Sequence, residues 1–334
     1  MSASPTPRPL LLTAAIAVQA CIVSAGLTAC TPTVDTRPKQ LAAEYLTRVV
    51  DGDIEAALKL DGTTVGAGEV LLTNAAYKKA TDRISDYKIL DTALTKGRAD
   101  VRVRTVQHSG TKTTRLTLKK TKDSWRLLPA SLGFLQIAPS PVGTAPTIAG
   151  QAIPAEKVTT VHAFPGTYEL AGTSSPNITI TPVTNTLTGF GSHLNVTPGA
   201  SLTEAGIAAV HRGADNWLTG CATKGDAAIA PNCPFSIDTT KKWWTNSRWN
   251  ITQAPSYTIS SWQADCAWPG SQPGFAAIGC WLVDSNAVPV TFTASSPDSD
   301  DSTTAPVAIT VHGWVRSFTG AEADFQNVPY PEPR

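Results

Sequence analysis

The residues best suited to covalent chemistry in this chain are the cysteines that follow residue 200. Four of the six cysteines are found there, at Cys221, Cys233, Cys266 and Cys280. Their spacings lack the C-x2-C form of zinc sites and no histidine sits nearby at ligand spacing, so disulfides in an oxidising compartment are favoured. Four cysteines allow three pairings. We prefer Cys221–Cys233 with Cys266–Cys280, which closes short loops rich in Gly, Pro and Ala and is worth about 3 kcal/mol per bridge.

A further cysteine, Cys30, ends an apolar stretch that runs from Leu10 to Leu27. The sequence Leu27-Thr28-Ala29-Cys30 resembles the bacterial lipobox, in which the cysteine is diacylglycerylated and the chain is cut just before it. The resemblance implies a signal peptide over residues 1–29 and a lipid anchor on Cys30 at the outer face of the plasma membrane. An uncleaved membrane anchor and a plain secretory signal are the alternatives. No other stretch reaches the roughly 18 apolar residues of a transmembrane helix.

Motifs of catalysis are sparse. G-x-S-x-G, H-E-x-x-H and G-x-x-x-x-G-K do not occur. Ser85-Asp86-Tyr87-Lys88 matches S-x-x-K, but it lacks the partner motifs of penicillin-binding proteins and lies in a predicted strand. The aspartates of the run PDSDDS at 297–302 are interpreted as a solvated hairpin loop rather than a calcium site. The five histidines are scattered, with no i, i+4 pair, at positions 108, 162, 193, 211 and 312. We therefore predict no catalytic residue, no metal and no cofactor.

Charged residues alternate with aliphatic ones along two predicted strands. Val101 and Val103 alternate with basic residues in the first strand, and Leu116 and Leu118 do so in the second. Because side chains of a strand point to opposite faces in turn, the aliphatic residues face the core and the basic ones share the other face. This basic face, a candidate site for lipid head groups or anionic wall polymers, consists of Arg102, Arg104, Arg115 and Lys119. An ordinary solvated face is the alternative.

Composition narrows the class of protein. The chain has 334 residues, of which 42% are hydrophobic and 16% charged, with a net charge of +1. The hydrophobic content excludes a disordered chain, the length predicts two or three domains, and the net charge argues against a nucleic-acid binder. Charge is divided unevenly, because residues 37–128 hold 18 Lys+Arg against 11 Asp+Glu, a net +7, whereas residues 200–334 hold 7 against 12, a net −5.

Module one, residues 38–130, follows a short tether at 30–37. Its helical spacing predicts a helix from Pro38 to Gly52, a second helix capped by Asp53, and a third over Glu69–Ala80. The period then changes to two and predicts four strands, with a turn at Ser109-Gly110. Helices followed by a meandering antiparallel sheet are typical of an α+β domain.

This order, with the opening YLTRVVDGDIEAAL and the closing DSWRLLP, resembles the cystatin-like fold of the nuclear-transport-factor-two-like (SnoaL-like) superfamily. It looks most like the small versions in envelope lipoproteins of high-GC Gram-positive bacteria. Some members of that superfamily are enzymes with a pocket between helix and sheet, and others only bind. No pocket Asp–His pair can be transferred, since His108 is the only histidine of module one.

The rest of the chain is predicted as a β-rich spacer and a second α+β module. The middle module, residues 131–199, is rich in Pro, Thr and Gly, with short strands around a Pro165-Gly166 turn. In the C-terminal module, residues 200–326, Ser201 and Glu204 form a predicted capping box for one helix, and antiparallel strands follow. Residues 327–334 are a predicted loose tail.

We thus expect a non-enzymatic, membrane-anchored envelope lipoprotein that binds an envelope protein, anionic lipid or wall polymer. An enzyme with a pocket in module one is the first alternative. A glycan-binding module is the second, because eight of the nine tryptophans lie in the C-terminal module, Trp243-Trp244 among them.

Overall fold

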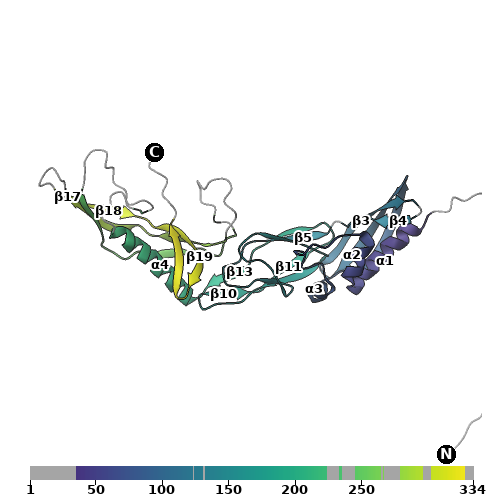
Figure 1. The fold of residues 1–334 in the computed structure, drawn as a ribbon, viewed down its shortest axis with the longest axis horizontal. Coiled ribbons are helices and arrows are strands. Elements are labelled where there is room, and N and C mark those ends of the chain that lie inside the picture. The colour runs from purple at the N-terminus through teal and green to yellow at the C-terminus, as the bar shows by residue number, and fades with distance from the viewer. Residues whose placement is uncertain are drawn as a thin grey trace, which may run out of the picture. The chain divides into compact units, whose positions relative to one another are not determined.

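The computed structural model describes residues 35–122, 124–130, 132–223, 233–234, 245–264, 266, 279–295 and 302–327 (Figure 1). The fold is mixed α+β and rich in strands, and its named elements belong to one compact unit, Thr36–Arg334. Several predicted features lie outside the described residues: the signal peptide, Cys30, the aspartate run, Trp243-Trp244 and the end of the tail. No helix within the described ranges is long and apolar enough to cross a bilayer.

Three helices open module one: α1 Arg37–Asp51, α2 Ile54–Asp61 and α3 Asn74–Lys79. The first ends at Gly52, whose φ of +76° suits a residue without a side chain. The third begins later than expected, because Thr73 accepts a hydrogen bond from the Ala76 amide and caps the helix there. Asp53 occupies the N-cap position of α2, as predicted, but its side chain makes no capping bond and pairs with Arg48 at 3.3 Å.

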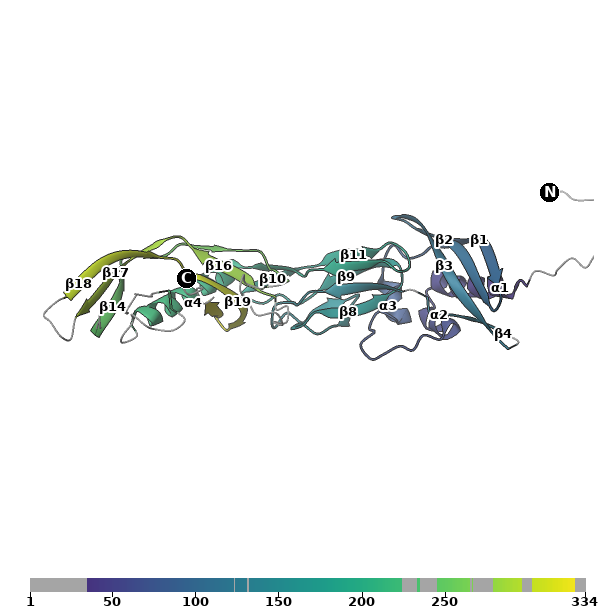
Figure 2. The same ribbon diagram turned by 90° about the horizontal axis from the view of Figure 1, so that it is seen from above.

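A four-stranded antiparallel meander follows, in the predicted order β1-β2-β3-β4. The strands are β1 Asp86–Thr95, β2 Arg98–Gln107, β3 Gly110–Thr121 and β4 Ser124–Leu127. The helices lie along one face of this sheet (Figure 2). Inward side chains such as Val101, Val103 and Leu118 are fully buried beneath them. The hydrophobic alternation of the sequence therefore corresponds to the covered and open faces of the sheet.

The middle module consists of short strands: β5 Gly133–Ile137, β6 Thr147–Ile148, β7 Gln151–Ala152, β8 Thr159–Ala163, β9 Gly166–Ala171, β10 Ile178–Thr181, β11 Val183–Leu187, β12 His193–Val196 and β13 Gly199–Leu202. They form three sheets, in the orders β11-β9-β6-β7, β12-β5-β8 and β10-β13. The Pro165-Gly166 segment does not close a hairpin. It carries the chain from β8 in one sheet to β9 in another.

Module one and the middle module share a single hydrophobic core. Phe164, at the end of β8, is fully buried, and its ring centroid lies 6.4 Å from that of Tyr45 and 5.8 Å from that of Tyr77. The Tyr77 hydroxyl donates to the Pro165 carbonyl at 3.2 Å. Thr81 and Thr167 form an antiparallel bridge between the two modules. At residue 130 the architecture therefore changes from helices on a sheet to short strands alone, whereas the hydrophobic core continues across this boundary.

The C-terminal module opens with α4, Glu204–Ala222. The predicted capping box is wrong in its first residue. Thr203 is the cap and accepts a hydrogen bond from the Gly206 amide at 3.0 Å. Ser201 is instead held in β13, where it pairs with Thr179 of β10. Because strand pairing holds Ser201 in β13, the N-cap of α4 lies two residues later than the local motif predicted.

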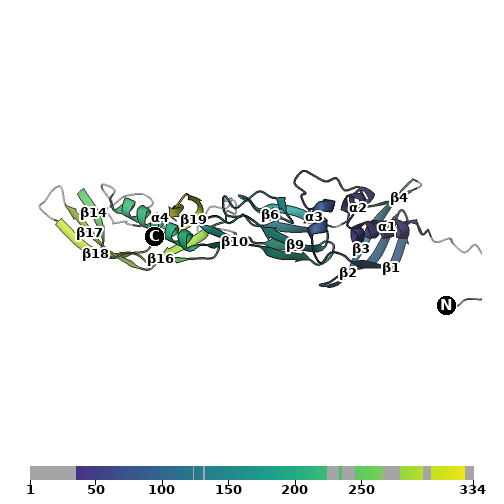
Figure 3. The ribbon, with the colours of Figure 1, turned by 90° about the horizontal axis from the view of Figure 1, so that it is seen from below.

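Seven strands complete the C-terminal module: β14 Thr245–Ile251, β15 Tyr257–Ile259, β16 Trp281–Ser285, β17 Val288–Ser295, β18 Ser302–Ile309, β19 His312–Thr319 and β20 Glu322–Asn327. They form sheets in the orders β14-β17-β18 and β15-β16-β19-β20 (Figure 3). The first half of α4 packs through Val210 against the second sheet, and its second half packs through Leu218 against the first. A helix followed by antiparallel strands is again the observed order, as predicted.

Candidate functional site

The basic face lies on the open side of the module one sheet. Arg102, Arg104, Arg115 and Lys119 are all exposed, and their aliphatic neighbours on β2 and β3 are at most 2% exposed. Arg102 and Arg115 are direct cross-strand partners. Like charges that face each other across a strand pair are destabilising, so this arrangement costs stability unless another charge compensates it. The predicted grouping of these side chains on one face is confirmed; their ligand stays a prediction.

Two aspartates neutralise part of this face. Asp91 of β1 forms an ion pair with Arg102, and Asp100 of β2 pairs with Arg98 at 3.1 Å. Partial burial raises the pKa of Asp100, but hydrogen bonds from Thr117 and Arg98 outweigh it and hold the pKa below its usual value. Asp100 is therefore ionised at neutral pH.

A β-bulge puts Asp91 in that position. The register pairs Ile89 with Val103 and then Asp91 with Arg102, so Leu90 is the extra residue. Regular alternation would have placed Leu90 opposite Arg102. Arg104, Arg115 and Lys119 have no ion pair among the described residues. The basic face therefore has fewer unpaired cations than the sequence suggested.

Buried side chains pack in the space between the helices and the sheet of module one. Tyr45, Leu46, Ile54 and Leu127 are among its fully buried side chains. The one buried carboxylate there, Asp61, accepts bonds from the Thr63 amide at 2.8 Å and the Ala130 amide at 3.3 Å. Each of its two oxygens thus accepts a backbone hydrogen bond, one from the residues just after α2 and one from the end of module one.

Tyr45 lies beside this carboxylate. Its hydroxyl is buried without a hydrogen bond of normal geometry, and burial, followed by the charge of Asp61, raises the pKa of Tyr45 well above its usual value. A neutral phenol and a backbone-bound carboxylate in a packed interior are typical of a structural role.

Two histidines form carboxylate pairs that the sequence did not reveal. The His162 ring lies 2.7 Å from Glu69, whose other oxygen accepts the His162 amide at 2.9 Å. His312 lies 2.6 Å from Asp284, its cross-strand partner. Phe134 stands between His162 and His193 in register, with its ring stacked on His193 at 5.5 Å. Strand pairing, which no i, i+4 search can detect, creates the contacts of His312 with Asp284 and of Phe134 with His193. The contact of His162 with Glu69 instead joins β8 to the segment between α2 and α3.

A third constellation lies between α4 and the edge strand β15. The Tyr257 hydroxyl donates to Asp215 at 2.8 Å, and the His211 ring lies 5.3 Å from the Tyr257 ring. Burial, then the hydrogen bond and charge of Asp215, raise the pKa of Tyr257 far above its usual range. Tyr257 therefore acts as a neutral donor that ties β15 to the helix.

A shallow groove of about 270 Å³ separates α4 from β20. Arg212, Asn216, Glu322 and Asp324 line it. Arg212 donates to the Ala321 carbonyl at 2.7 Å, so its charge is partly used to hold the two elements together. Within the described ranges, no group of three or more His, Cys, Asp and Glu side chains is placed to hold a metal ion.

Both predicted disulfides, Cys221–Cys233 and Cys266–Cys280, are present. The first fastens the end of α4, where Cys221 is 2% exposed. Structural disulfides persist in oxidising compartments, so the pair indicates an extracytoplasmic protein.

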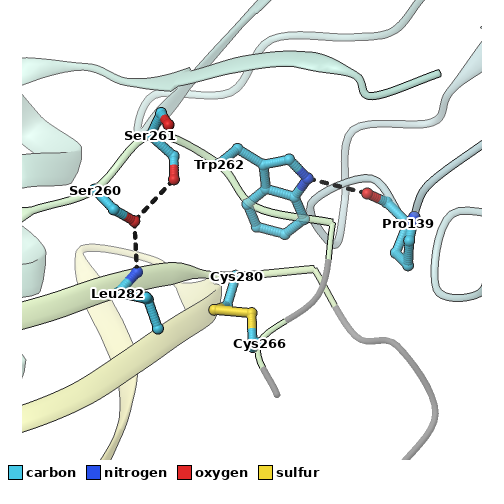
Figure 4. Close-up of a disulfide and its surroundings, with 7 residues drawn as sticks. All are labelled: Pro139, Ser260, Ser261, Trp262, Cys266, Cys280 and Leu282. Carbon is cyan, nitrogen blue, oxygen red and sulfur yellow. Dashed lines mark hydrogen bonds between the residues drawn. A yellow bond between two sulfur atoms is a disulfide. The ribbon is translucent and has the colours of Figure 1, made fainter. Parts of the chain in front are cut away.

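The second disulfide lies next to Trp262 (Figure 4). The Trp262 indole donates to the Pro139 carbonyl of the middle module at 3.0 Å and meets the Trp281 ring at 4.5 Å. Trp249, Trp262 and Trp281 are at most 6% exposed. These three tryptophans belong to the core, and the other described tryptophans, Trp125, Trp217 and Trp314, are half-buried.

The arrangement presents one open cluster of cations on the exposed face of the module one sheet. Sequence reasoning found these cations and missed the aspartate that pairs with one of them. Comparison with known proteins adds no assignment: no protein-family model, curated protein or solved structure matches this chain.

Proposed function

We propose that this protein is an extracytoplasmic lipoprotein, tethered through Cys30, whose module one binds phosphate-rich polyanions of the cell envelope through the basic face. The observation that carries the proposal is that three exposed cations of this face, Arg104, Arg115 and Lys119, form no ion pair with a described residue. Asp100 is near enough for its charge to interact with that of Arg115, but it pairs with Arg98. Arginine binds phosphate oxygens in a bidentate manner, and the two disulfides support the compartment.

The tether supports the same proposal. The tether from Cys30 to the start of α1 at Arg37 is seven residues long, which span at most about 25 Å when extended. A lipid on Cys30 would keep module one within that distance of the membrane and its associated polymers. Two acyl chains hold a protein on a bilayer without a spanning helix.

The fold proposal follows the same lines. The helices that cover one face of an antiparallel meander in module one support a cystatin-like domain that binds and does not catalyse. The buried Asp61, whose two oxygens are bound by backbone amides, supports the non-enzymatic interpretation. The same order in the C-terminal module supports a second, divergent unit of this kind.

The test of the basic face uses residues 31–334, which lack the lipid, and soluble poly(glycerol phosphate). Retention on the immobilised polymer should be clear at low salt and fall steeply as salt rises. Changing Arg102, Arg104, Arg115 and Lys119 to Gln should abolish it. The matched control changes Lys78, Lys112, Arg212 and Lys157 to Gln, which removes the same charge elsewhere.

If the control variant loses as much retention as the face variant, or if the unchanged protein is not retained, the proposal that the basic face binds the polymer is wrong. The anchor is tested separately by mass spectrometry of the native protein, which should show diacylglycerol on Cys30. A mature protein with an unmodified Cys30 would overturn the anchor alone.

A further inference from the structure

A second cluster of cations gathers at one end of module one. The β1–β2 turn holds Lys96, and the end of β3 holds Lys119, Lys120 and Lys122, all of them exposed. The Lys120 amide donates to the Gly97 carbonyl at 2.9 Å, so the two segments are in contact. None of these four lysines has an ion pair among the described residues. We call this group the lysine tip.

The local structure does not compensate this charge. Lys119 stands opposite Arg98 on one side and Arg126 on the other, so three cations form one row across β2, β3 and β4. Arg98 is paired with Asp100, and the Arg126 guanidinium lies against Gly62 at the negative end of α2. Within the described ranges the four lysines have no such partner, and in the sequence Asp123 follows Lys122.

The start of α1 lies at the same end of module one (Figures 2 and 3). Its first turn contains Lys39 and no acidic residue, and the Thr36 side chain makes no capping bond. A cation in the first turn is unfavourable, because the N-terminus of a helix is already positive. Leu94, next to the β1–β2 turn, is 41% exposed. Unpaired like charges, an uncapped helix start with a cation in its first turn, and an exposed leucine all lie at this end of module one. Several unfavourable local features at one place are typical of a functional surface.

The chain leads back from this end to Cys30, which is at most about 25 Å away. We propose that the lysine tip is the membrane-contacting surface of the protein and docks on anionic lipid head groups. The inference rests on the proposed tether and assigns lipid to the tip. Lys119 belongs to both surfaces, and the arginines of the basic face, Arg102, Arg104 and Arg115, stay open for polymer. Each lysine near an anionic bilayer adds about 1 kcal/mol, or roughly fivefold in affinity, within a Debye length of the surface.

The experiment measures sedimentation of residues 31–334 with vesicles of phosphatidylcholine alone or mixed with phosphatidylglycerol. The unchanged protein should bind only the mixed vesicles. The tip variant changes Lys96, Lys120 and Lys122 to Gln and should bind about 100-fold more weakly. The control variant changes Lys78, Lys112 and Lys157 to Gln, and the face variant changes Arg102, Arg104 and Arg115 to Gln. Both should lose less than about fivefold, and thermal melting should show all variants folded.

No binding to mixed vesicles, or equal losses in the tip and control variants, would overturn the inference. A large loss in the face variant with none in the tip variant would also overturn it, and would assign lipid to the basic face. Retention on poly(glycerol phosphate) is measured with the same variants. It reports on the proposed function alone, so a failure of either proposal is recognised independently of the other.

Discussion

Asp91 decides how much of the basic face is open to a ligand. The bulge at Leu90 places the Asp91 carboxylate against Arg102, so that Arg102 is paired and three unpaired cations of the basic face are left. The partners are both about half exposed, with side-chain exposures of 51% and 55%. Exposed pairs of this kind contribute about 0–1 kcal/mol to stability, so this aspartate matters more for charge than for folding.

Replacing Asp91 with Asn should therefore strengthen binding of poly(glycerol phosphate) about fivefold, because one further cation becomes free. The free energy of unfolding should change by less than about 1 kcal/mol. Affinity is measured by retention at fixed salt, and stability by urea unfolding. Asp51→Asn, at the exposed end of α1, gives the same change in net charge and should leave affinity nearly unaltered. Equal gains in both variants would show that net charge alone is responsible.

Trp262 couples the C-terminal module to the middle module through one buried hydrogen bond. Trp262→Phe keeps an aromatic ring and leaves the Pro139 carbonyl without its donor, which should cost about 1–3 kcal/mol in urea unfolding. Trp314→Phe is the control, since Trp314 is half-buried and its indole donates no hydrogen bond within the described ranges. Similar losses in the two variants would mean that ring size, and not the bond, is responsible.

At the scale of elements, the position of α4 depends on a close approach of its first turns to the middle module. Gly206 packs so tightly that an added Cβ would lie 2.1 Å from the Asn177 carbonyl oxygen. The same Asn177 carbonyl accepts the Thr203 amide at 3.1 Å, and the Asn177 side chain donates to the Gly320 carbonyl at 2.8 Å. The contact is made of backbone, which cannot move aside as a flexible side chain can.

Gly206→Ala should therefore destabilise the protein by at least about 2 kcal/mol, even though alanine is the better helix former. Gly220→Ala lies on the same helix with nothing within 4 Å of the added Cβ, and it should stabilise by about 0.5–1 kcal/mol. Thermal or urea unfolding compares the two. Opposite signs are expected, and two stabilising substitutions would show that α4 is not held at Asn177.

At the scale of the whole molecule, Phe164 joins two architecturally different modules in one core. Its ring touches those of Tyr45 and Tyr77 from module one and Phe190 from the middle module. A shared core makes the two modules unfold together. Module one isolated at residue 130 would expose apolar side chains that the full chain covers, so binding experiments need residues 31–334.

Phe164→Ala should cost about 3–5 kcal/mol and raise amide exchange in α1 and α3 as well as in β8 and β9. Exchange in α4 should change little. Phe292→Ala, in the separate core under β17, is the matched control and should give the reverse pattern. If Phe164→Ala loosens only the middle module, the two modules have independent stability.

Much of the fold could be predicted from the sequence because it depends on local patterns. The period-two alternation in β2 and β3, the helix–sheet order in both α+β modules and the disulfide pairing at short separations are all local signals. The capping interactions were less reliable. Asp53 does precede α2, but its side chain forms an ion pair instead of a capping bond, and β-pairing holds Ser201 so that Thr203 caps α4.

By itself the sequence determined which residues alternate, which cysteines are close along the chain, and how charge is divided between the first and last thirds. Each of these follows from covalent order and strand or helix period. Only the tertiary structure decided that Asp91 neutralises Arg102, that Phe164 unites two modules, and that Lys96 joins Lys120 and Lys122 at the end where α1 starts. These contacts join segments far apart in sequence, and their geometry depends on register, bulges and packing that no local period encodes.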